Sequence, residues 1–360
     1  MRVRSSQTLV LSPQGNEIVA FNFLTKSVFA CAPETLNVLQ TLNDWRPLEQ
    51  AVSLLPGNSR GSNLQQIQDM IDATAIVAED SSQATIENEF LENWDWGIPA
   101  ALMHFSLKDC SFMTPQEIED LQQQKAAETP SPSLYARNHG LQTVPLPGAL
   151  EKNQLLQLMA RRRTVRNSLP RSITIKQLSD SLFAGMGITG ETRNCVCKLP
   201  LSMTPSGGAR NPYEAYVYAR NVDGLEPGFY HYSAIEHSLG RLATSLAPKP
   251  SELLASQEWA DDKPCIIFLV ALMERSMWKY VDPNAYRGVL IEAGHIGQNI
   301  MLSATDHNLS ACPTAAFCHS LLHECLEIDG ATHCAMYALT LGAPDKDDTY
   351  KLTNSNNIYF

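Results

Sequence analysis

Hydrophobic residues in the N-terminal third follow strand-like spacing first and helix-like spacing afterwards. Short apolar runs at 9–11 and 18–21 flank a turn of Pro, Gly and Asn residues at 13–16, which predicts a hairpin. The spacing of apolar residues predicts helices at three places: 33–42, 47–55 and 64–73. A returning strand at 76–78 completes a pattern that indicates a small winged-helix-like domain.

This N-terminal domain has two candidate uses. It could bind a peptide by adding a strand to the edge of its sheet, or it could only cover the rest of the protein. Most of the acidic excess of the chain precedes residue 130. A basic leader peptide would suit that charge, although a solvated acidic face explains it equally well.

The rest of the chain mixes helix and strand patterns without a repeating order. Prolines, serines and a glycine predict a linker at 129–150, between a domain at 1–128 and a domain at 151–360. The second domain has helix patterns at 155–163, 175–186 and 288–306 and strand patterns at 213–219 and 265–272. This irregular alternation indicates an α+β fold rather than a doubly wound sheet. Gly185, Gly187 and Gly190 have the dinucleotide-binding spacing but the wrong order of strand, turn and helix.

Composition narrows the classes of protein that remain. The 360 residues, 44% of them apolar, are enough for a large core. A net charge of −11 argues against a nucleic-acid partner, because binding phosphates needs clustered Lys and Arg. We find no signal peptide and no membrane span, and the nine cysteines, an odd number, fit free thiols in a reducing cytoplasm.

A cluster of basic residues follows the first predicted helix of the second domain. Residues 161–166 read Arg-Arg-Arg-Thr-Val-Arg. Guanidinium groups form paired, charge-assisted hydrogen bonds with phosphate. Taken alone, the cluster predicts a phosphate-binding segment and a solvated basic patch equally well.

A glycine-containing loop at 205–212 reads Pro-Ser-Gly-Gly-Ala-Arg-Asn-Pro and runs directly into the strand at 213–219. Paired glycines let a backbone approach a flat or phosphorylated ligand, and Ser206 and Arg210 could hydrogen-bond to it. For two glycines alone, a simple turn is the simpler explanation.

Five ordered motifs together resemble the nitroreductase superfamily, and more closely its SagB-type dehydrogenases, which include the azoline oxidases of ribosomally made peptides. The resemblance covers about residues 150–345, and its motifs are 162–166, 184–189, 206–208, 224–232 and 292–299. The opening Met1–Arg4 and the length look like those of a subgroup of peptide maturation dehydrogenases. The resemblance implies a nitroreductase-like fold that binds flavin mononucleotide (FMN) and forms a homodimer.

The resemblance also implies which residues bind the flavin. The phosphate and ribityl chain would be held by Arg162, Arg163, Thr164 and Arg166, and the flavin would be lined by Ser206, Gly207, Gly208 and Arg210. The backbone of Pro313, Thr314, Ala315 and Ala316 matches the segment that family members place against N5 of the ring. Backbone donors at that edge would stabilise charge on the reduced ring. One departure follows Phe317, where relatives often have an acidic pair and this chain has Cys318-His319.

A lysine and a tyrosine, Lys279 and Tyr280, match the catalytic pair of the azoline oxidases. Oxidising an azoline removes a ring proton while electrons pass to the flavin, so a base near the substrate is needed. Either side chain could be that base if its surroundings favour the deprotonated form. Without the resemblance, an amphipathic pair at the edge of a loop would be the simpler explanation.

Two further groups of polar residues have structural explanations. Glu292, His295 and Asn299 share one face of the helix at 288–306, where such residues are more often structural contacts than catalysts. Histidines and cysteines also gather near the C-terminus: Cys312, Cys318, His319, His323, Cys325, His333 and Cys334. No Cys-x-x-Cys pair accompanies them, so we expect buried thiols and no metal.

Three functions are consistent with these observations. The leading one is an FMN-dependent dehydrogenase that oxidises azoline rings, or a related bond, in a precursor peptide, beside a cyclodehydratase partner. The second runs the chemistry in reverse, with a nicotinamide donor reducing nitro, quinone or enone groups. The third is a non-catalytic protein that presents a peptide to another enzyme.

Overall fold

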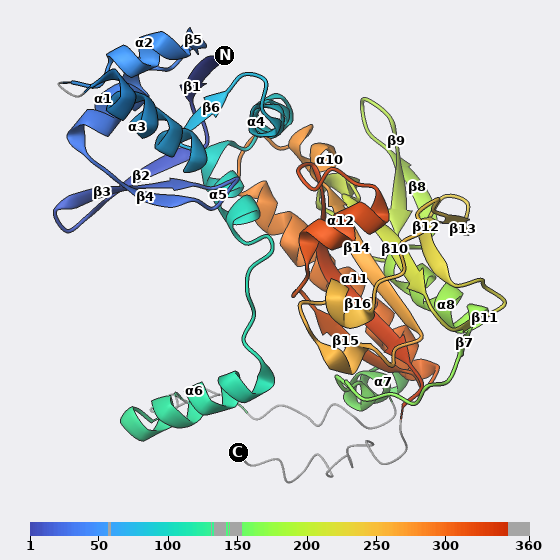
Figure 1. Ribbon diagram of the computed structural model, residues 1–360. Coiled ribbons are helices and arrows are strands. Elements are labelled where there is room, and N and C mark those ends of the chain that lie inside the picture. The colour runs from blue at the N-terminus through green and yellow to red at the C-terminus, as the bar shows by residue number, and fades with distance from the viewer. Residues whose placement is uncertain (57–58, 131, 133–141, 143, 145–152, 345–360) are drawn as a thin grey trace. The chain divides into compact units, whose positions relative to one another are not determined.

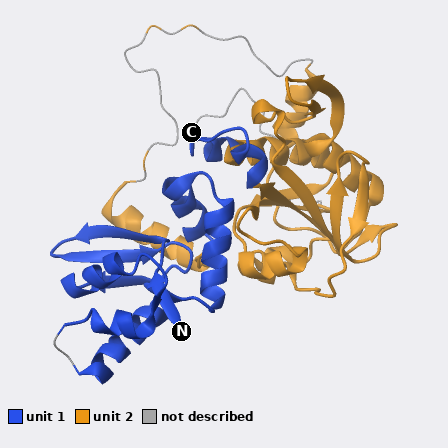
Figure 2. Ribbon diagram, turned by 90° about the horizontal axis from the view of Figure 1, so that it is seen from above, with its two compact units in different colours: residues 1–108, 273–288 blue, residues 109–272, 289–360 orange. Residues whose placement is uncertain are grey.

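The computed structural model describes residues 1–56, 59–130, 132, 142, 144 and 153–344. The chain forms two compact units (Figure 2): unit 1 comprises residues 1–108 and 273–288, and unit 2 comprises residues 109–272 and 289–360. The sequence predicts a division at 129–150, most of which lies outside the described residues, and that division stays a prediction. The grouping of 273–288 with the N-terminal residues is a feature that no local pattern indicates.

Unit 1 contains two three-stranded antiparallel sheets with helices around them (Figure 1). One sheet has the order β5 (Arg46–Pro47), β1 (Arg2–Ser5) and β6 (Ile76–Ala78), and the other β2 (Leu9–Gln14), β3 (Glu17–Asn22) and β4 (Val28–Cys31). The helices from the first segment are α1 (Pro33–Thr41), α2 (Leu48–Ser53), α3 (Arg60–Asp72), α4 (Ser82–Asn93) and α5 (Gly97–Ser106). The predicted hairpin, helices and returning strand are all present at 9–78.

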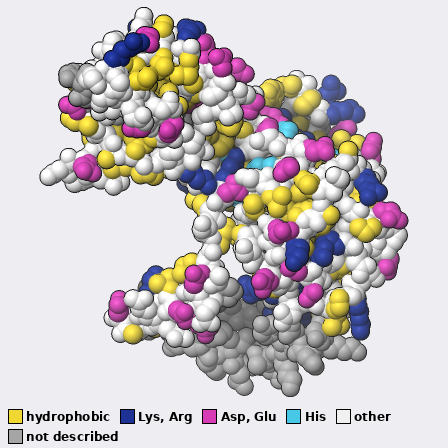
Figure 3. All heavy atoms as spheres, viewed as in Figure 1, with side chains coloured by type: hydrophobic (Ala, Val, Ile, Leu, Met, Phe, Trp, Pro, Cys, Tyr) yellow, Lys and Arg dark blue, Asp and Glu magenta, His cyan; other side chains and the backbone are white. Residues whose placement is uncertain are grey.

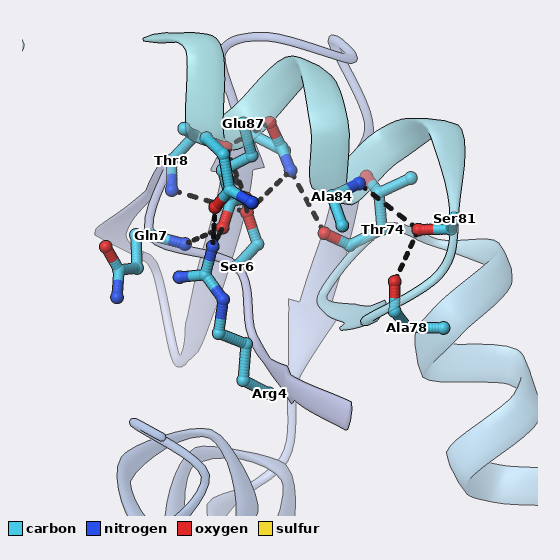
Figure 4. Close-up of polar contacts among 11 residues, drawn as sticks. Arg4, Ser6, Gln7, Thr8, Thr74, Ala78, Ser81, Ala84 and Glu87 are labelled. Atoms are coloured by element: carbon cyan, nitrogen blue, oxygen red, sulfur yellow. Dashed lines mark hydrogen bonds and ion pairs between the residues drawn. The ribbon is translucent and has the colours of Figure 1, made fainter. Parts of the chain in front are cut away.

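A buried polar network connects strand β1 to helix α4 in unit 1. Figure 4 shows Arg4 and Glu87 facing each other, and Arg4 Nη2 lies 2.9 Å from Glu87 Oε1. Both side chains are almost fully buried. The Ser6 hydroxyl donates to Glu87 Oε2, and the Thr8 hydroxyl lies 2.9 Å from Ser6 Oγ. Because an ion pair buried in this way is costly to break, the network fixes the start of the chain against α4.

Unit 2 is built on a six-stranded sheet in which neighbouring strands are antiparallel. Its order is β13 (Ser238–Arg241), β12 (Gly228–Ser233), β10 (Tyr213–Ala219), β14 (Cys265–Leu272), β16 (His333–Gly342) and β15 (Ser310–Thr314). Strand β14 is buried along nearly all of its length. Its continuous apolar sequence fits this position, because a central strand covered on both faces needs no polar alternation.

Helices cover both faces of this sheet. Ala338 of β16 packs in a cluster with Leu322 of α12 (His319–Leu326), whereas the neighbouring Tyr337 lies against Gly297 of α11 (Ala285–Asp306). Successive strand residues point to opposite faces, so α12 and α11 lie on opposite sides of the sheet. The remaining helices are α6 (Pro115–Glu128), α7 (Gln154–Arg161), α8 (Ile175–Met186), α9 (Pro250–Leu253) and α10 (Met273–Met277). The shorter strands are β7 (Ile173–Thr174), β8 (Ile188–Arg193), β9 (Lys198–Ser202) and β11 (Val222–Asp223).

These observations confirm the α+β fold predicted from the sequence. Helix α8 precedes strand β8 at the glycines 185, 187 and 190, so the element order of a dinucleotide-binding turn is reversed there. Within the part of the chain that the structure describes, no helix has the length and apolar character that crossing a membrane requires.

Candidate functional site

The arginine segment, residues 161–166, lies along the outer edge of the sheet of unit 2. Helix α7 ends at Arg161, and Thr164 then pairs in parallel with Ala311 of the edge strand β15. The Val165 N–H donates to the Ala311 carbonyl at 3.1 Å. This pairing holds the backbone of the segment extended and presents its side chains at the sheet edge.

A fully buried lysine, Lys263, binds the backbone of the arginine segment. Lys263 Nζ lies 3.4 Å from the carbonyl oxygen of Val165 and 3.5 Å from that of Asn167. It also donates to Ser310 Oγ of β15 at 3.3 Å. The ammonium group therefore ties the segment to the sheet, and it adds a positive charge at a site shielded from water. The sequence gives little sign of this role, because a single lysine before a strand is usually exposed.

The charges of Arg162 and Arg166 act on side chains of strands β15 and β16. Burial raises the pKa of the Cys312 thiol on β15, and the charges of Arg166 and Lys263 oppose that rise. Burial and the nearby Cys312 raise the pKa of Tyr337 on β16, and the charge of Arg162 opposes that rise. Among the described residues, neither Arg162 nor Arg166 has a carboxylate partner. Two guanidinium groups without a counter-charge are suited to binding an anion.

Arg163 is engaged differently from its neighbours. Its Nη1 donates to the carbonyl oxygens of Ala160 and Arg162, both at 2.7 Å. These bonds satisfy carbonyl groups at the C-terminal end of α7, where a cation is also favoured by the helix dipole. In this structure Arg163 therefore caps the helix, and the exposed Thr164 lies beside it.

The glycine loop, residues 206–210, is hydrogen-bonded to helix α11. The Gly207 N–H donates to Glu292 Oε1 at 2.7 Å, and the Asn211 N–H donates to Ser206 Oγ at 2.8 Å. Gly208 has φ 61°, a left-handed conformation that favours glycine. Burial raises the pKa of Glu292, although hydrogen bonds from Gly207 and Ser206 and the charge of His295 oppose the rise. The hydroxyl of Ser206 thus stabilises the loop through hydrogen bonds within the protein. Arg210, at the end of the loop, is half-buried.

A second contact holds the strand that leads into this loop. Asn299 Nδ2 donates to Thr204 Oγ1 at 3.1 Å, and that hydroxyl donates to the Gly185 carbonyl of α8 at 2.6 Å. Glu292 and Asn299 are seven residues apart, which is about 10.5 Å along a helix. Both make structural polar contacts, which is the role that their shared helix face favoured.

The segment 313–316 continues from the end of strand β15. Gln257 Nε2 donates to Thr314 Oγ1 at 3.0 Å, and the Ala316 N–H donates to the same oxygen at 3.1 Å. Pro313 has no N–H. Thr314 pairs with Ala338 of β16 in the sheet, and the exposed Ala315 therefore remains as the candidate backbone donor for a ring placed at this edge.

Helix α11 contacts both candidate flavin-binding motifs or their neighbours within unit 2. Glu292 latches the glycine loop, and Gly297 packs so closely on Tyr337 that an added Cβ would lie 2.5 Å from Tyr337 Cε1. The charge of Arg162 in turn opposes the rise in the pKa of Tyr337. The residues fit FMN at both ends: Arg162 and Arg166 suit a phosphate, and the glycine loop presents backbone where a flat ring needs close approach.

Lys279 and Tyr280 belong to unit 1, whereas the flavin-binding candidates belong to unit 2, so the structure does not bring the two sets together within one unit. Lys279 is exposed and Tyr280 is half-buried, and Lys279 Nζ lies 5.3 Å from the centre of the Tyr280 ring. The pair directly follows the short helix α10.

The histidines and cysteines near the C-terminus form no metal centre in the described part of the chain, where no group of three or more candidate ligands is suitably placed. The His319 and His323 rings lie edge to face with centroids 5.8 Å apart. His319 Nδ1 accepts a hydrogen bond from the Asp109 N–H at 3.2 Å. Cys312, Cys325 and Cys334 are buried.

Comparison with known proteins identifies relatives of unit 2. The sequence profile of the nitroreductase family matches residues 159–343. MJ1384 of Methanocaldococcus jannaschii, which is named as a nitroreductase, is 32% identical over 180 residues, covering 50% of this chain and 87% of that protein. TfxB of Rhizobium leguminosarum bv. trifolii, a trifolitoxin-processing protein, is 31% identical over 142 residues, covering 38% of each chain.

Solved structures give weaker likenesses. A nitroreductase-type protein from Anabaena variabilis has 28% identity and a TM-score of 0.43, over 46% of this chain and 34% of that chain. A chain of the E. coli microcin synthetase McbBCD complex, with truncated pro-MccB17 bound, has 19% identity and a TM-score of 0.44, over 65% and 96% of the two chains. Both TM-scores are below 0.5, so the family assignment rests on the sequence matches.

Proposed function

Because the chain belongs to the nitroreductase family, we propose that it oxidises azoline rings, thiazoline or oxazoline, or a related bond in a ribosomally made precursor peptide. The family consists of FMN-dependent oxidoreductases, and FMN is the cofactor. The azoline substrate and the individual site residues are the parts that we propose.

The proposed flavin site rests on Arg162 and Arg166, near strand β15, which have no carboxylate partner among the described residues. They would hold the FMN phosphate, with Lys263 fixing the backbone beneath them. Gly207 and Gly208 would lie against the flavin, because they have no side chain that blocks a close approach. Ala315, directly after Thr314 at the end of β15, would direct its backbone N–H group at the ring.

The similarity to TfxB supports a peptide substrate, since that protein is named for the processing of trifolitoxin. Unit 1 gives independent support, because a reductase of small molecules has no evident need for a domain of this size. Figure 3 shows hydrophobic side chains among acidic ones over the helices of unit 1. A surface of this kind suits a basic leader segment with apolar anchors.

The reaction removes two hydrogen atoms from the azoline ring. Bound FMN would supply the acceptor for the electron pair and for one hydrogen from the carbon that is oxidised. The other hydrogen leaves as a proton, and Tyr280 or Lys279 would accept it. Dioxygen would finally receive the two electrons and two protons, so that azoline and dioxygen give azole and hydrogen peroxide.

The test of this proposal uses the full-length protein and a precursor peptide that carries one thiazoline. We expect the purified protein to show a flavin absorption spectrum and the peptide to lose the mass of two hydrogen atoms on incubation in air. Tyr280→Phe should retain bound FMN and lose turnover, because a phenyl ring cannot accept the proton. Wild-type turnover by Tyr280→Phe would remove this tyrosine from the mechanism.

The match to MJ1384 favours a second candidate function, a nicotinamide-dependent reductase of nitro, quinone or enone groups. The two functions differ in the electron donor. Adding a nicotinamide without oxygen should leave the flavin absorption of a peptide oxidase unchanged over the time of turnover. Rapid bleaching, together with no change in the thiazoline peptide, would favour the reductase.

Two partners belong to the same proposal. A cyclodehydratase must make the azoline before it can be oxidised, and we expect the two enzymes to act on one leader peptide. A second copy of this chain is also expected, and helix α7 exposes Leu155 and Met159, which a dimer contact would cover. The mass of the protein in solution tests the homodimer directly.

A further inference from the structure

Residues 273–288, the Lys-Tyr segment, carry Lys279 and Tyr280 between strand β14 and the rest of helix α11. Both of those elements lie largely in unit 2, yet the segment groups with the N-terminal residues. The side chains around the catalytic pair are exposed: Trp278 is 62% and Val281 84% accessible. The contacts of the segment with residues 1–108 of the same unit therefore help to fix the position of Tyr280.

The first of these contacts reaches Tyr280 itself. Trp96 Nε1 donates a hydrogen bond to the Tyr280 carbonyl oxygen at 2.7 Å. Trp96 is only 1% exposed and lies at the N-cap of helix α5. The indole is thus a rigid donor with little room to move, and it fixes the backbone from which the phenol side chain extends.

The second contact holds the segment six residues further on. His104 Nδ1 lies 3.2 Å from the Tyr286 hydroxyl. The Tyr286 ring also meets the Trp96 indole edge to face, with centroids 6.0 Å apart. His104 and Tyr286 are 4% and 6% exposed. Helix α5 and its N-cap residue therefore hold the Lys-Tyr segment at two residues, Tyr280 of the pair and Tyr286 after it.

A neighbouring tryptophan, Trp94, donates to a different backbone acceptor and serves as a comparison. Trp94 Nε1 donates to the Gly97 carbonyl at 3.0 Å, within the turn between α4 and α5. Its ring packs against Phe90 and Phe105, and it also meets the rings of Trp96 and His104 with centroids 6.0 and 5.0 Å away, contacts that a phenyl ring at this position can still make in part. Trp94 and Trp96 are both buried indoles with a backbone acceptor, and only the acceptor of Trp96 lies in the Lys-Tyr segment.

We propose that Trp96 and His104 are positioning residues that hold Tyr280 in place for proton transfer. The inference rests on the proposed function, because it requires Tyr280 to act on the substrate. It assigns to the N-terminal unit a part in the reaction besides any peptide binding. Proton transfer depends steeply on distance, and a shift of about 1 Å in a catalytic group can lower the rate about 100-fold.

The experiment compares Trp96→Phe with Trp94→Phe in full-length protein loaded with FMN. Each variant keeps an aromatic ring and loses one N–H donor. We expect Trp96→Phe to lower kcat about 10- to 100-fold with KM changed less than about threefold, and Trp94→Phe to change neither. The pH profile of kcat should shift or flatten in Trp96→Phe alone.

A second measurement is independent of activity. Hydrogen–deuterium exchange of FMN-free protein should be faster at 277–286 in Trp96→Phe than in wild type, and unchanged there in Trp94→Phe. If Trp96→Phe does not fold, Tyr286→Phe serves instead, because it keeps the ring and removes only the hydroxyl that meets His104. It should speed exchange at 281–288 and lower kcat to a smaller extent.

The outcomes separate this inference from the proposed function. Exchange and kcat that are equal in Trp96→Phe and Trp94→Phe, while Tyr280→Phe is inactive, would overturn the positioning role and leave the function standing. Wild-type turnover by Tyr280→Phe would overturn the proposed base, and the positioning role with it. Faster exchange with a selective loss of kcat in Trp96→Phe would support both.

Discussion

Replacing Glu292 with alanine should release the glycine loop from helix α11 and weaken FMN binding. Glu292 is 8% exposed, and its Oε1 accepts the Gly207 N–H at 2.7 Å. A hydrogen bond to a charged group contributes about 1.5–3 kcal/mol. If the free loop must be reordered when FMN binds, the dissociation constant should rise roughly 10- to 100-fold.

Glu292→Gln is the matched control for this prediction. Its amide oxygen can still accept the Gly207 N–H, so its affinity for FMN should stay within about threefold of wild type. Quenching of FMN fluorescence during titration of FMN-free protein measures all three dissociation constants. Equal affinities for wild type and Glu292→Ala would show that the latch does not shape the flavin site.

The same pair of proteins gives a prediction about pH. Burial raises the pKa of Glu292 in the folded protein, so ionisation opposes folding. Wild type therefore loses this contribution to stability as pH rises from the unfolded carboxyl pKa, about 4.3, through the raised folded value. Glutamine does not titrate, so the Tm of Glu292→Gln minus that of wild type should grow from pH 4 to pH 7. A constant difference would contradict the cause given for the shift.

Three further substitutions test the site and the fold. Arg162→Ala should abolish retention of FMN during purification. Arg163→Ala removes the side chain that caps α7 and should retain FMN with a slightly lower Tm. Equal losses of flavin in the two variants would contradict these separate roles. Lys263→Met should lower the free energy of unfolding by about 2 kcal/mol and weaken FMN binding in the titration, because two carbonyls and a hydroxyl lose their buried donor. Glu87→Gln should lower the free energy of unfolding by about 3 kcal/mol in urea, because Arg4 loses its ionised partner. Its flavin absorption per folded molecule should match wild type, and an unchanged urea midpoint would refute the assigned importance of the pair.

Local patterns were sufficient to predict the helices and strands whose apolar residues have regular spacing and clear boundaries. Strands β10 and β14 begin and end where the sequence places them, because their apolar runs are bounded by turn residues. The long helix α11 begins at Ala285, three residues before its predicted start. Helices α4, α5 and α6 have no counterpart among the predicted elements, since their apolar residues do not form one regular stripe.

Contacts between residues distant in sequence could not be predicted in this way. Lys263 meets Val165 across 98 positions, Gly207 meets Glu292 across 85, and Trp96 meets Tyr280 across 184. The motifs indicate which side chains suit a phosphate or a ring, because that depends on residue type and spacing. They do not indicate which buried group fixes each motif, because that depends on packing in three dimensions.

Unit 1 is formed by two separate stretches of the chain, 1–108 and 273–288. This arrangement limits how the protein can recombine with its relatives. A single crossover near residue 150 would join a foreign α5 to the resident 273–288, and the residues at positions 96 and 104 would face hydrogen-bond partners that did not evolve with them. A double exchange that carries 1–108 and 273–288 together would preserve these contacts. Chimeras designed to redirect such an enzyme to a new leader should therefore move the two stretches as one cassette.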